Sequence, residues 1–236
     1  MGPLLETEQS SPERGRGLIG ALGLAIAIWQ VVSFLIDLNT PSPTGPNALS
    51  AYVAHADILW ADELALIVLV GLSVPFFVGV GRILAPRSPT VIGGAVLLVA
   101  AGFLVFMVGE TIEFVGLWAV TQGPTLGVYA PSATVQASFA YVLGSTMYGF
   151  GFFLLGAGLI LLAWVSWGSE LFPKWLSTLA FVAGIMAILS QVPALTFFLY
   201  VAVAILYLIF ALVIGYRLIR PGRSAIPEAV PEDSRP

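Results

Sequence analysis

Residues 104–120 read LVFMVGETIEFVGLWAV, an apolar stretch of the kind that crosses membranes, and it contains two carboxylates three residues apart, Glu110 and Glu113. Apolar runs of about 20 residues recur along almost the whole chain, and each is long enough to cross a hydrocarbon core of about 30 Å. Of the 236 residues, 58% are hydrophobic and 9% are charged, whereas soluble domains have about 25% charged residues. The sequence therefore predicts an all-α integral membrane protein.

Six transmembrane helices are predicted, and together they form a single domain over residues 17–216. Their approximate limits are 17–38, 56–81, 91–120, 133–167, 175–192 and 194–216. The last two, divided at Pro193, could instead form one broken helix. Residues 1–16 and 217–236 contain the charged ends of the chain, and the composition of 1–16 and 221–236 is typical of disordered tails. The first span is too long for a signal-peptide core and is expected to stay as an anchor.

The basic residues predict the orientation, because Lys and Arg near span ends accumulate on the cytoplasmic side. All of them fall on one side of a six-span arrangement: Arg14, Arg16, Arg82, Arg87, Lys174, Arg217, Arg220, Arg223 and Arg235. Five crossings would put the last arginines outside. We therefore expect a multi-pass protein of the cell (cytoplasmic) membrane with both termini in the cytoplasm.

Small residues recur every seven positions in the third and fourth spans. The third span carries Ala95, Gly102, Gly109 and Gly116, and the fourth carries Ala137, Gly144, Gly151 and Gly158. A seven-residue repeat keeps one helix face in register along a left-handed crossing, and small residues let two backbones approach closely. We call this set the glycine seam. It predicts an antiparallel hairpin that pairs Gly102 with Gly151 and Gly109 with Gly144, although Gly and Ala are also common in membrane helices without such a role.

Six acidic residues belong to the predicted outer half of the membrane domain, and no basic residue accompanies them. They are Asp37, Asp57, Asp62, Glu63, Glu110 and Glu113. A carboxylate at the centre of a span costs roughly 2.5 to 3.5 kcal/mol, so such acids usually face a bundle interior or a watered cavity. Two carboxylates about 6 Å apart repel by roughly 3 kcal/mol at an effective dielectric constant of about 20. A proton, a bound cation or a cationic ligand is expected to offset this repulsion.

The predicted ligand-binding or proton-binding residues are Glu110, Glu113, Glu63, Tyr141, Asp62 and Gln136. Other polar residues share their depth, namely Ser138, Ser145, Tyr148, Gln191, Thr196 and Tyr200. Trp60 and Trp118 could line the same region, but interfacial tryptophans more often form an aromatic belt. His55 is expected at the rim. The alternative interpretation makes Glu110 and Glu113 a protonated pair that only joins helices.

Composition excludes several classes of site. The absence of cysteine excludes disulfides and thiolate metal sites, and a single histidine excludes a bis-histidine haem within one chain. We find no phosphate-binding glycine loop, no zincin motif and no nucleophile elbow. No basic patch suggests nucleic acid as a partner. The sequence predicts no cofactor and no metal.

The segment FPKWLSTLAFVAGI (172–185) follows WVSWGSEL (164–171) at the end of a long span. This arrangement resembles an uncharacterised six-helix prokaryotic membrane family, domain-of-unknown-function family 4386, in which a Pro-Lys pair opens the fifth helix. The resemblance covers about residues 15–220 and implies the fold. It implies no activity and no site residue.

Three functions stay open at this point. The first is an outward-facing carboxylate pocket that binds or transports a cation, a proton or a small amphipathic molecule. The second is a membrane-embedded enzyme that uses paired carboxylates on a lipid or isoprenoid, in a cavity lined by aromatic residues. The third is a structural or assembly subunit. The expected partners are the lipid bilayer and such a small ligand.

Overall fold

The computed structural model describes residues 11–39, 55–122, 130–169, 171–192 and 195–220, and all regular secondary structure in these ranges is helical. The helices are α1 (Ser11–Asp37), α3 (Ala56–Leu84), α4 (Pro89–Gln122), α5 (Ala130–Ser166), α6 (Lys174–Leu189) and α7 (Thr196–Ile219). Each lies at the position of one predicted span, so the all-α prediction is confirmed.

Five of these helices are long and apolar enough to cross a membrane; α6 is the exception. It has 16 residues, which rise about 24 Å, less than a hydrocarbon core of about 30 Å. The six predicted helices are therefore present: five are long apolar helices, and the fifth predicted span is the shorter apolar helix α6. The fifth span was predicted to end at about residue 192, whereas α6 ends at Leu189 and the polar residues Ser190 and Gln191 form a turn.

The first helix begins at Ser11, six residues before the expected start of the first span at residue 17. Ser, Pro and Glu at positions 11–13 are residue types that favour a helix N-terminus. Because these residues are polar, hydropathy predicts a later start than the helix has. The apolar part of α1 covers Gly15–Asp37.

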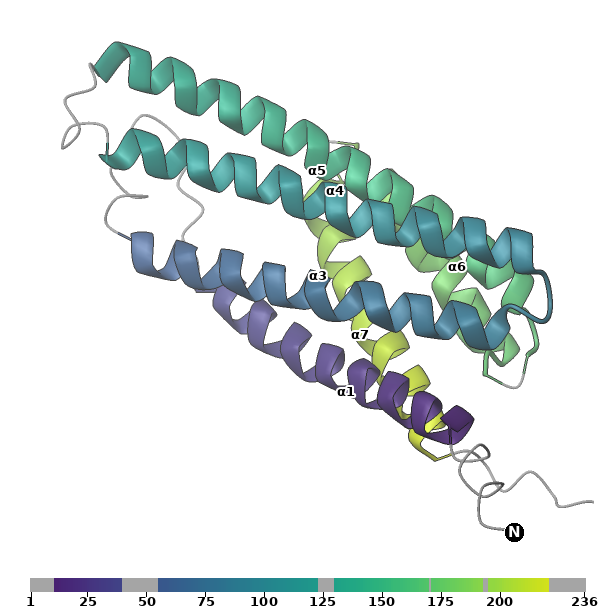
Figure 1. The fold of residues 1–236 in the computed structure, drawn as a ribbon. Coiled ribbons are helices and arrows are strands. Elements are labelled where there is room, and N and C mark those ends of the chain that lie inside the picture. The colour runs from purple at the N-terminus through teal and green to yellow at the C-terminus, as the bar shows by residue number, and fades with distance from the viewer. Residues whose placement is uncertain (1–10, 40–54, 123–129, 170, 193–194, 221–236) are drawn as a thin grey trace, which may run out of the picture.

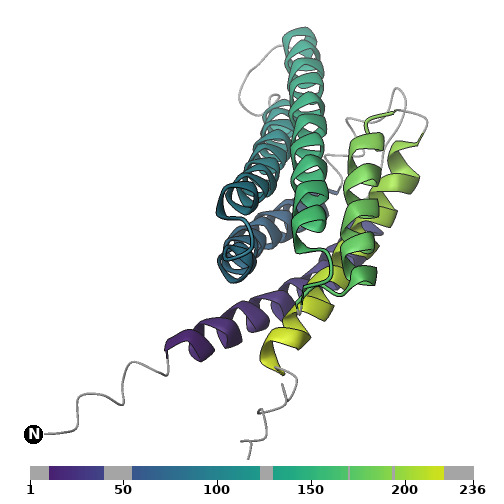
Figure 2. The same cartoon turned by 90° about the vertical axis from the view of Figure 1, so that its right-hand side faces the viewer.

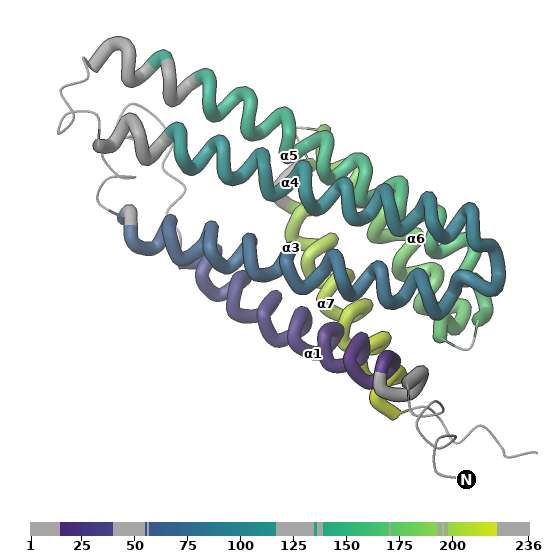
Figure 3. The backbone as a smooth tube through the Cα atoms, in the orientation of Figure 1, coloured from purple at the N-terminus to yellow at the C-terminus, as the bar shows by residue number. Residues whose placement is uncertain are grey.

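The six helices form a closed ring in which each packs against its neighbours in the sequence. α1 contacts α3, α3 contacts α4, and so on through α6 and α7, and α7 closes the ring against α1. Figure 1 shows the α4–α5 hairpin above α3 and α1, with α7 crossing behind them. In the perpendicular view of Figure 2, α1 and α7 are inclined to the α4–α5 hairpin. The chain alternates in direction from helix to helix, as the trace in Figure 3 shows.

The start of α1 and the end of α7 lie at the same end of the ring (Figure 1). The α3–α4 turn and the residues after α5 also lie at this end. They are joined by a hydrogen bond that Nη1 of Arg87 donates to the carbonyl oxygen of Trp167 at 3.4 Å. We call this the basic end, since Arg82, Arg87 and Lys174 occupy its turns and helix termini. The outer surface carries many exposed apolar side chains, among them Trp164 and Phe198, so a lipid bilayer is the environment that the helices fit.

Glycines allow three pairs of helices to approach closely. A Cβ atom added at Gly102 of α4 would lie 2.8 Å from the carbonyl oxygen of Gly151 of α5, and one at Gly109 would lie 2.7 Å from that of Gly144. The other two pairs are α5 with α6 (Gly156 and Gly184) and α1 with α7 (Gly20 and Gly215). Gly116 approaches Ala140. Continued by one more repeat, the register that pairs Gly102 with Gly151 and Gly109 with Gly144 predicts Ala137 as the partner of Gly116, and the side chain of Ala137 lies outside the described residues.

Candidate functional site

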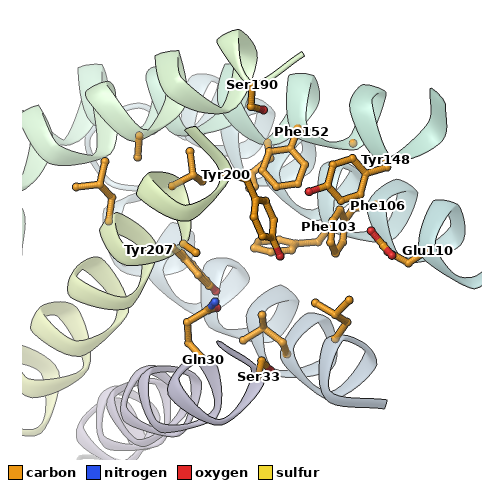
Figure 4. Close-up of a pocket in the computed structure, with 18 of the residues that line it drawn as sticks. Gln30, Ser33, Phe103, Phe106, Glu110, Tyr148, Phe152, Ser190, Tyr200 and Tyr207 are labelled. Carbon is orange, nitrogen blue, oxygen red and sulfur yellow. The ribbon is translucent and has the colours of Figure 1, made fainter. Parts of the chain in front are cut away.

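The ring encloses a cavity of about 680 Å³, and every helix contributes to its walls. The charged and amide-bearing residues that line it are Gln30, Asp37, Asp62, Glu110, Glu113 and Gln191. Figure 4 shows Gln30 and Tyr207 approaching the cavity from one side and Glu110 and Tyr148 from another. Residues from all six helices are thus brought to one space.

Four carboxylates line this cavity: Asp37 at the end of α1, Asp62 near the start of α3, and Glu110 and Glu113 on α4. The two glutamates are three residues apart, a spacing that places them on one side of a helix. The close approach of α4 to α5 fixes Glu113, because a Cβ atom at Gly144 would lie 2.9 Å from the Cβ atom of Glu113. The described residues that line the cavity include no Lys or Arg.

Electrostatic repulsion links these acids into one cluster. The charge of Glu110 interacts with those of Glu63, Glu113, Asp62 and Asp37. Glu63 does not line the cavity, but its carboxylate interacts with those of Asp62 and Glu113. The cluster therefore favours a positively charged occupant, which would reduce the repulsion between several carboxylates at once.

Aromatic rings form much of the remaining wall. The ring centroid of Tyr148 lies 4.8 Å from that of Phe106, 4.9 Å from that of Phe152 and 6.3 Å from that of Tyr200. The ring centroids of Phe103 and Tyr207 lie 5.7 Å from each other. These separations are those of ordinary aromatic pairs. The π faces of such rings attract cations as well as apolar groups.

The cavity is amphipathic from its open end to its floor. At the open end, Asp37, Tyr141, Ser145 and Gln191 are exposed, and the side chain of Tyr141 is 54% exposed. At the floor the walls are apolar and buried, as Leu159 illustrates. An occupant with a charged head and an apolar body matches this gradient.

A hydrogen bond between α7 and α3 fixes the side chain of Tyr207. Its hydroxyl donates to Oγ of Ser73 at 2.6 Å, and the hydroxyl of Ser73 donates to the carbonyl oxygen of Leu69 at 2.6 Å. Replacing Tyr207 by Phe removes the first bond, and we expect a loss of about 0.5 to 1.5 kcal/mol in the free energy of unfolding. Thermal unfolding in detergent measures it. In a Ser73→Ala background the same replacement should cost less, and an equal cost in both backgrounds would contradict this account.

The structure brings together most of the residues predicted for the site. Glu110, Glu113, Asp62 and Tyr141 line the cavity, as do Ser145, Tyr148, Gln191 and Tyr200. The side chains of Gln136, Ser138, Thr196 and Trp118 lie outside the described residues. His55 is exposed at the start of α3. Trp60 does not line the cavity and instead meets Phe114 edge to face at 4.6 Å.

Helix α1 contributes two polar residues to the cavity that were not among the predicted site residues. Gln30 and Ser33 line the cavity together with Asp37, and their spacing of three and seven residues puts all three on one face of the helix. These are isolated polar residues in an otherwise apolar segment, IAIWQVVSFLID. Their shared helix face is the feature of the sequence from which they could have been predicted.

The acids do not form a metal site among the residues that the structure describes. No group of three or more His, Asp or Glu side chains in this part of the chain is arranged to hold a metal ion. The prediction of no metal concerns the whole chain and stays a prediction.

The ring of apolar helices defines a multi-pass membrane protein with an internal carboxylate cavity. The chain belongs to the family described as Domain of unknown function (DUF4386), which matches residues 18–222. The resemblance that residues 164–185 carry is thereby confirmed. No curated protein and no solved structure matches the chain.

Proposed function

We propose that the protein binds a small amphipathic cation in the central cavity. The observation that carries this proposal is the combination of four carboxylates, aromatic walls and no basic residue among the described residues that line one enclosed space. A proton alone would satisfy the carboxylates, but it would leave about 680 Å³ of aromatic-walled space unused. An inorganic cation would leave the same space unused.

Two attractive forces favour such an occupant over a neutral one. A unit charge about 4 Å from a carboxylate gains about 4 kcal/mol at an effective dielectric constant of about 20, before the cost of removing water. A cation over an aromatic face gains about 0.5 to 2 kcal/mol more. Protonated alkylamines combine the required charge with an apolar chain, so they are suitable probes.

The test compares an n-alkylamine with the n-alkanol of the same chain length. Both are titrated against the protein in nanodiscs, with empty nanodiscs as the reference for partition into lipid. We expect the amine to bind at least tenfold more tightly, a difference of about 1.4 kcal/mol. Infrared difference spectra in the carboxyl region should change with the amine alone. Equal binding of the two probes would refute the proposal.

A second candidate is a membrane-embedded enzyme, and the aromatic walls around Tyr148 favour it. Such walls stabilise positive charge that develops in a reaction, and paired carboxylates can divide the roles of acid and stabilising base. Substrates with a phosphate or diphosphate head fit poorly, because the described lining has no basic group to bind them. Conversion of a neutral isoprenoid, followed by mass spectrometry, would distinguish catalysis from binding.

We also propose that the cavity opens outward and that the basic end faces the cytoplasm of the cell membrane, as the positive-inside rule predicts. The absence of cysteine permits a test without background labelling. We expect a cysteine at Asn39 to react with an impermeant maleimide on intact cells, and a cysteine at Pro86 to react only after permeabilisation. The opposite pattern would reverse the orientation.

A further inference from the structure

Two buried side-chain oxygen atoms on α1, in residues that line the cavity, have no hydrogen-bond partner among the described residues. Oε1 of Gln30 and Oγ of Ser33 make no hydrogen bond, although the side chains are only 9% and 4% exposed. Both residues line the cavity, and Figure 4 shows the amide of Gln30 pointing toward the hydroxyl end of Tyr207. Buried polar groups are nearly always hydrogen-bonded, so two such groups beside one cavity indicate that its occupant supplies the partners.

We propose that Gln30 and Ser33 form a neutral subsite that binds a hydroxyl group of the ligand. The inference rests on the proposed function and specifies its ligand as an amphipathic amino alcohol. The ammonium group of this ligand lies beside the carboxylates, and its hydroxyl group lies beside Gln30 and Ser33. An amide and a serine hydroxyl each donate and accept hydrogen bonds, and a hydroxyl group on the ligand does the same.

The face of α1 also gives the length of this ligand. Gln30 and Asp37 are seven residues apart on the same face, a rise of about 10 Å along the helix. Asp37 belongs to the carboxylate cluster. A ligand that reaches from the cluster to Gln30 therefore has its ammonium and hydroxyl groups about 10 Å apart, with apolar carbons between them.

In the view of Figure 4, Phe103 and Phe106 lie between Glu110 and Gln30. Phe103, Phe106 and Phe152 carry no polar group and line the cavity. They fit the apolar carbons of the chain, since each methylene that leaves water for an apolar wall contributes to affinity. The cavity thus offers a charged end, an apolar middle and a neutral hydrogen-bonding end.

The experiment titrates an α,ω-amino alcohol of this length against the n-alkylamine of equal chain length, in nanodiscs. In the wild type we expect the amino alcohol to bind three- to tenfold more tightly, after correction for partition into empty nanodiscs. In Gln30→Met and in Ser33→Ala this preference should fall toward onefold, and the affinity for the alkylamine should not decrease, because the alkylamine has no hydroxyl group for the subsite to bind. Gln30→Met keeps the length of the side chain and removes the amide.

Ser177→Ala is the matched control. Oγ of Ser177 is also buried without a partner among the described residues, but Ser177 lies on α6 and does not line the cavity. The preference for the amino alcohol should survive in this variant. A loss in Ser177→Ala equal to that in Ser33→Ala would assign the effect to general packing and overturn the inference.

The outcomes separate the two proposals. If neither amine binds more tightly than the matched alkanol, the proposed function fails and the inference fails with it. If the alkylamine binds but the hydroxyl group adds nothing in the wild type, the proposed function stands and the inference is overturned. A preference for the amino alcohol that persists in both α1 variants would also overturn it.

Discussion

Glu110→Gln is expected to weaken the binding of an n-alkylamine by tenfold or more and to leave the affinity for the matched alkanol unchanged. Glu110 lines the cavity, and its charge interacts with those of four other carboxylates. The amide keeps the shape of the side chain and removes the negative charge. The attraction between one carboxylate and the ammonium group contributes several kcal/mol to the binding free energy at an effective dielectric constant of about 20. The remaining carboxylates offset part of this loss.

The folded state should not suffer from this change. Replacing one member of a cluster of like charges relieves repulsion, so we expect the melting temperature to stay the same or to rise. Asp57→Asn is the control, since Asp57 is exposed and does not line the cavity; its amine affinity should match that of the wild type. If Glu110→Gln binds the amine as the wild type does, the carboxylates have a structural role and the third function, an assembly subunit, is favoured.

The acid cluster could be predicted from the sequence because its members break a strong pattern. Charged side chains in apolar spans are rare, so the sequence alone indicates Glu110 and Glu113 as candidate site residues. Helix periodicity then predicts the face on which they lie. The seven-residue repeat of small residues also predicts that Tyr141 lies near Glu113, and both residues line the cavity. Such arguments need only spacing and the length of each span.

Gln30 and Ser33 were beyond that kind of argument. Neutral polar residues occur in many membrane helices without a function, and their significance depends on whether a partner lies nearby. That information comes from the closure of the ring by α1 and α7, which joins segments at opposite ends of the chain. Periodicity within one span does not predict which distant span packs against it.

The end of α6 lies slightly before the limit of about residue 192 that was predicted for the fifth span. The sequence becomes polar at Ser190 and Gln191. Ser190 has left the helix, and its hydroxyl donates to the carbonyl oxygen of Ala187 at 2.7 Å. Serine hydroxyls that bond to a nearby carbonyl offer the backbone an alternative to the next helical turn. The turn brings Gln191 to Gly149 of α5 and to the open end of the cavity.

Gly102→Leu is expected to prevent the protein from folding, and we regard it as the strongest test of the glycine seam. A Cβ atom at Gly102 would lie 2.6 Å from the backbone nitrogen of Leu155 and 2.8 Å from the carbonyl oxygen of Gly151. Both neighbours are backbone atoms of α5, which a change of side-chain rotamer cannot move. The helices must separate, and we expect a loss of more than about 3 kcal/mol. Gly102→Ala should also lower the free energy of unfolding, but by less than Gly102→Leu.

The same helix supplies the control. A Cβ atom at Gly93 of α4 meets nothing within 4 Å, so Gly93→Leu adds the same side chain where there is space for it. A glycine in a helix costs about 1 kcal/mol relative to a better helix former, and this variant should be as stable as the wild type or slightly more stable. The yield of monodisperse protein and its thermal unfolding measure both effects. If Gly102→Leu folds as well as Gly93→Leu, α4 and α5 do not approach each other as closely as the seam requires, and the register that holds Glu113 beside Gly144 is wrong.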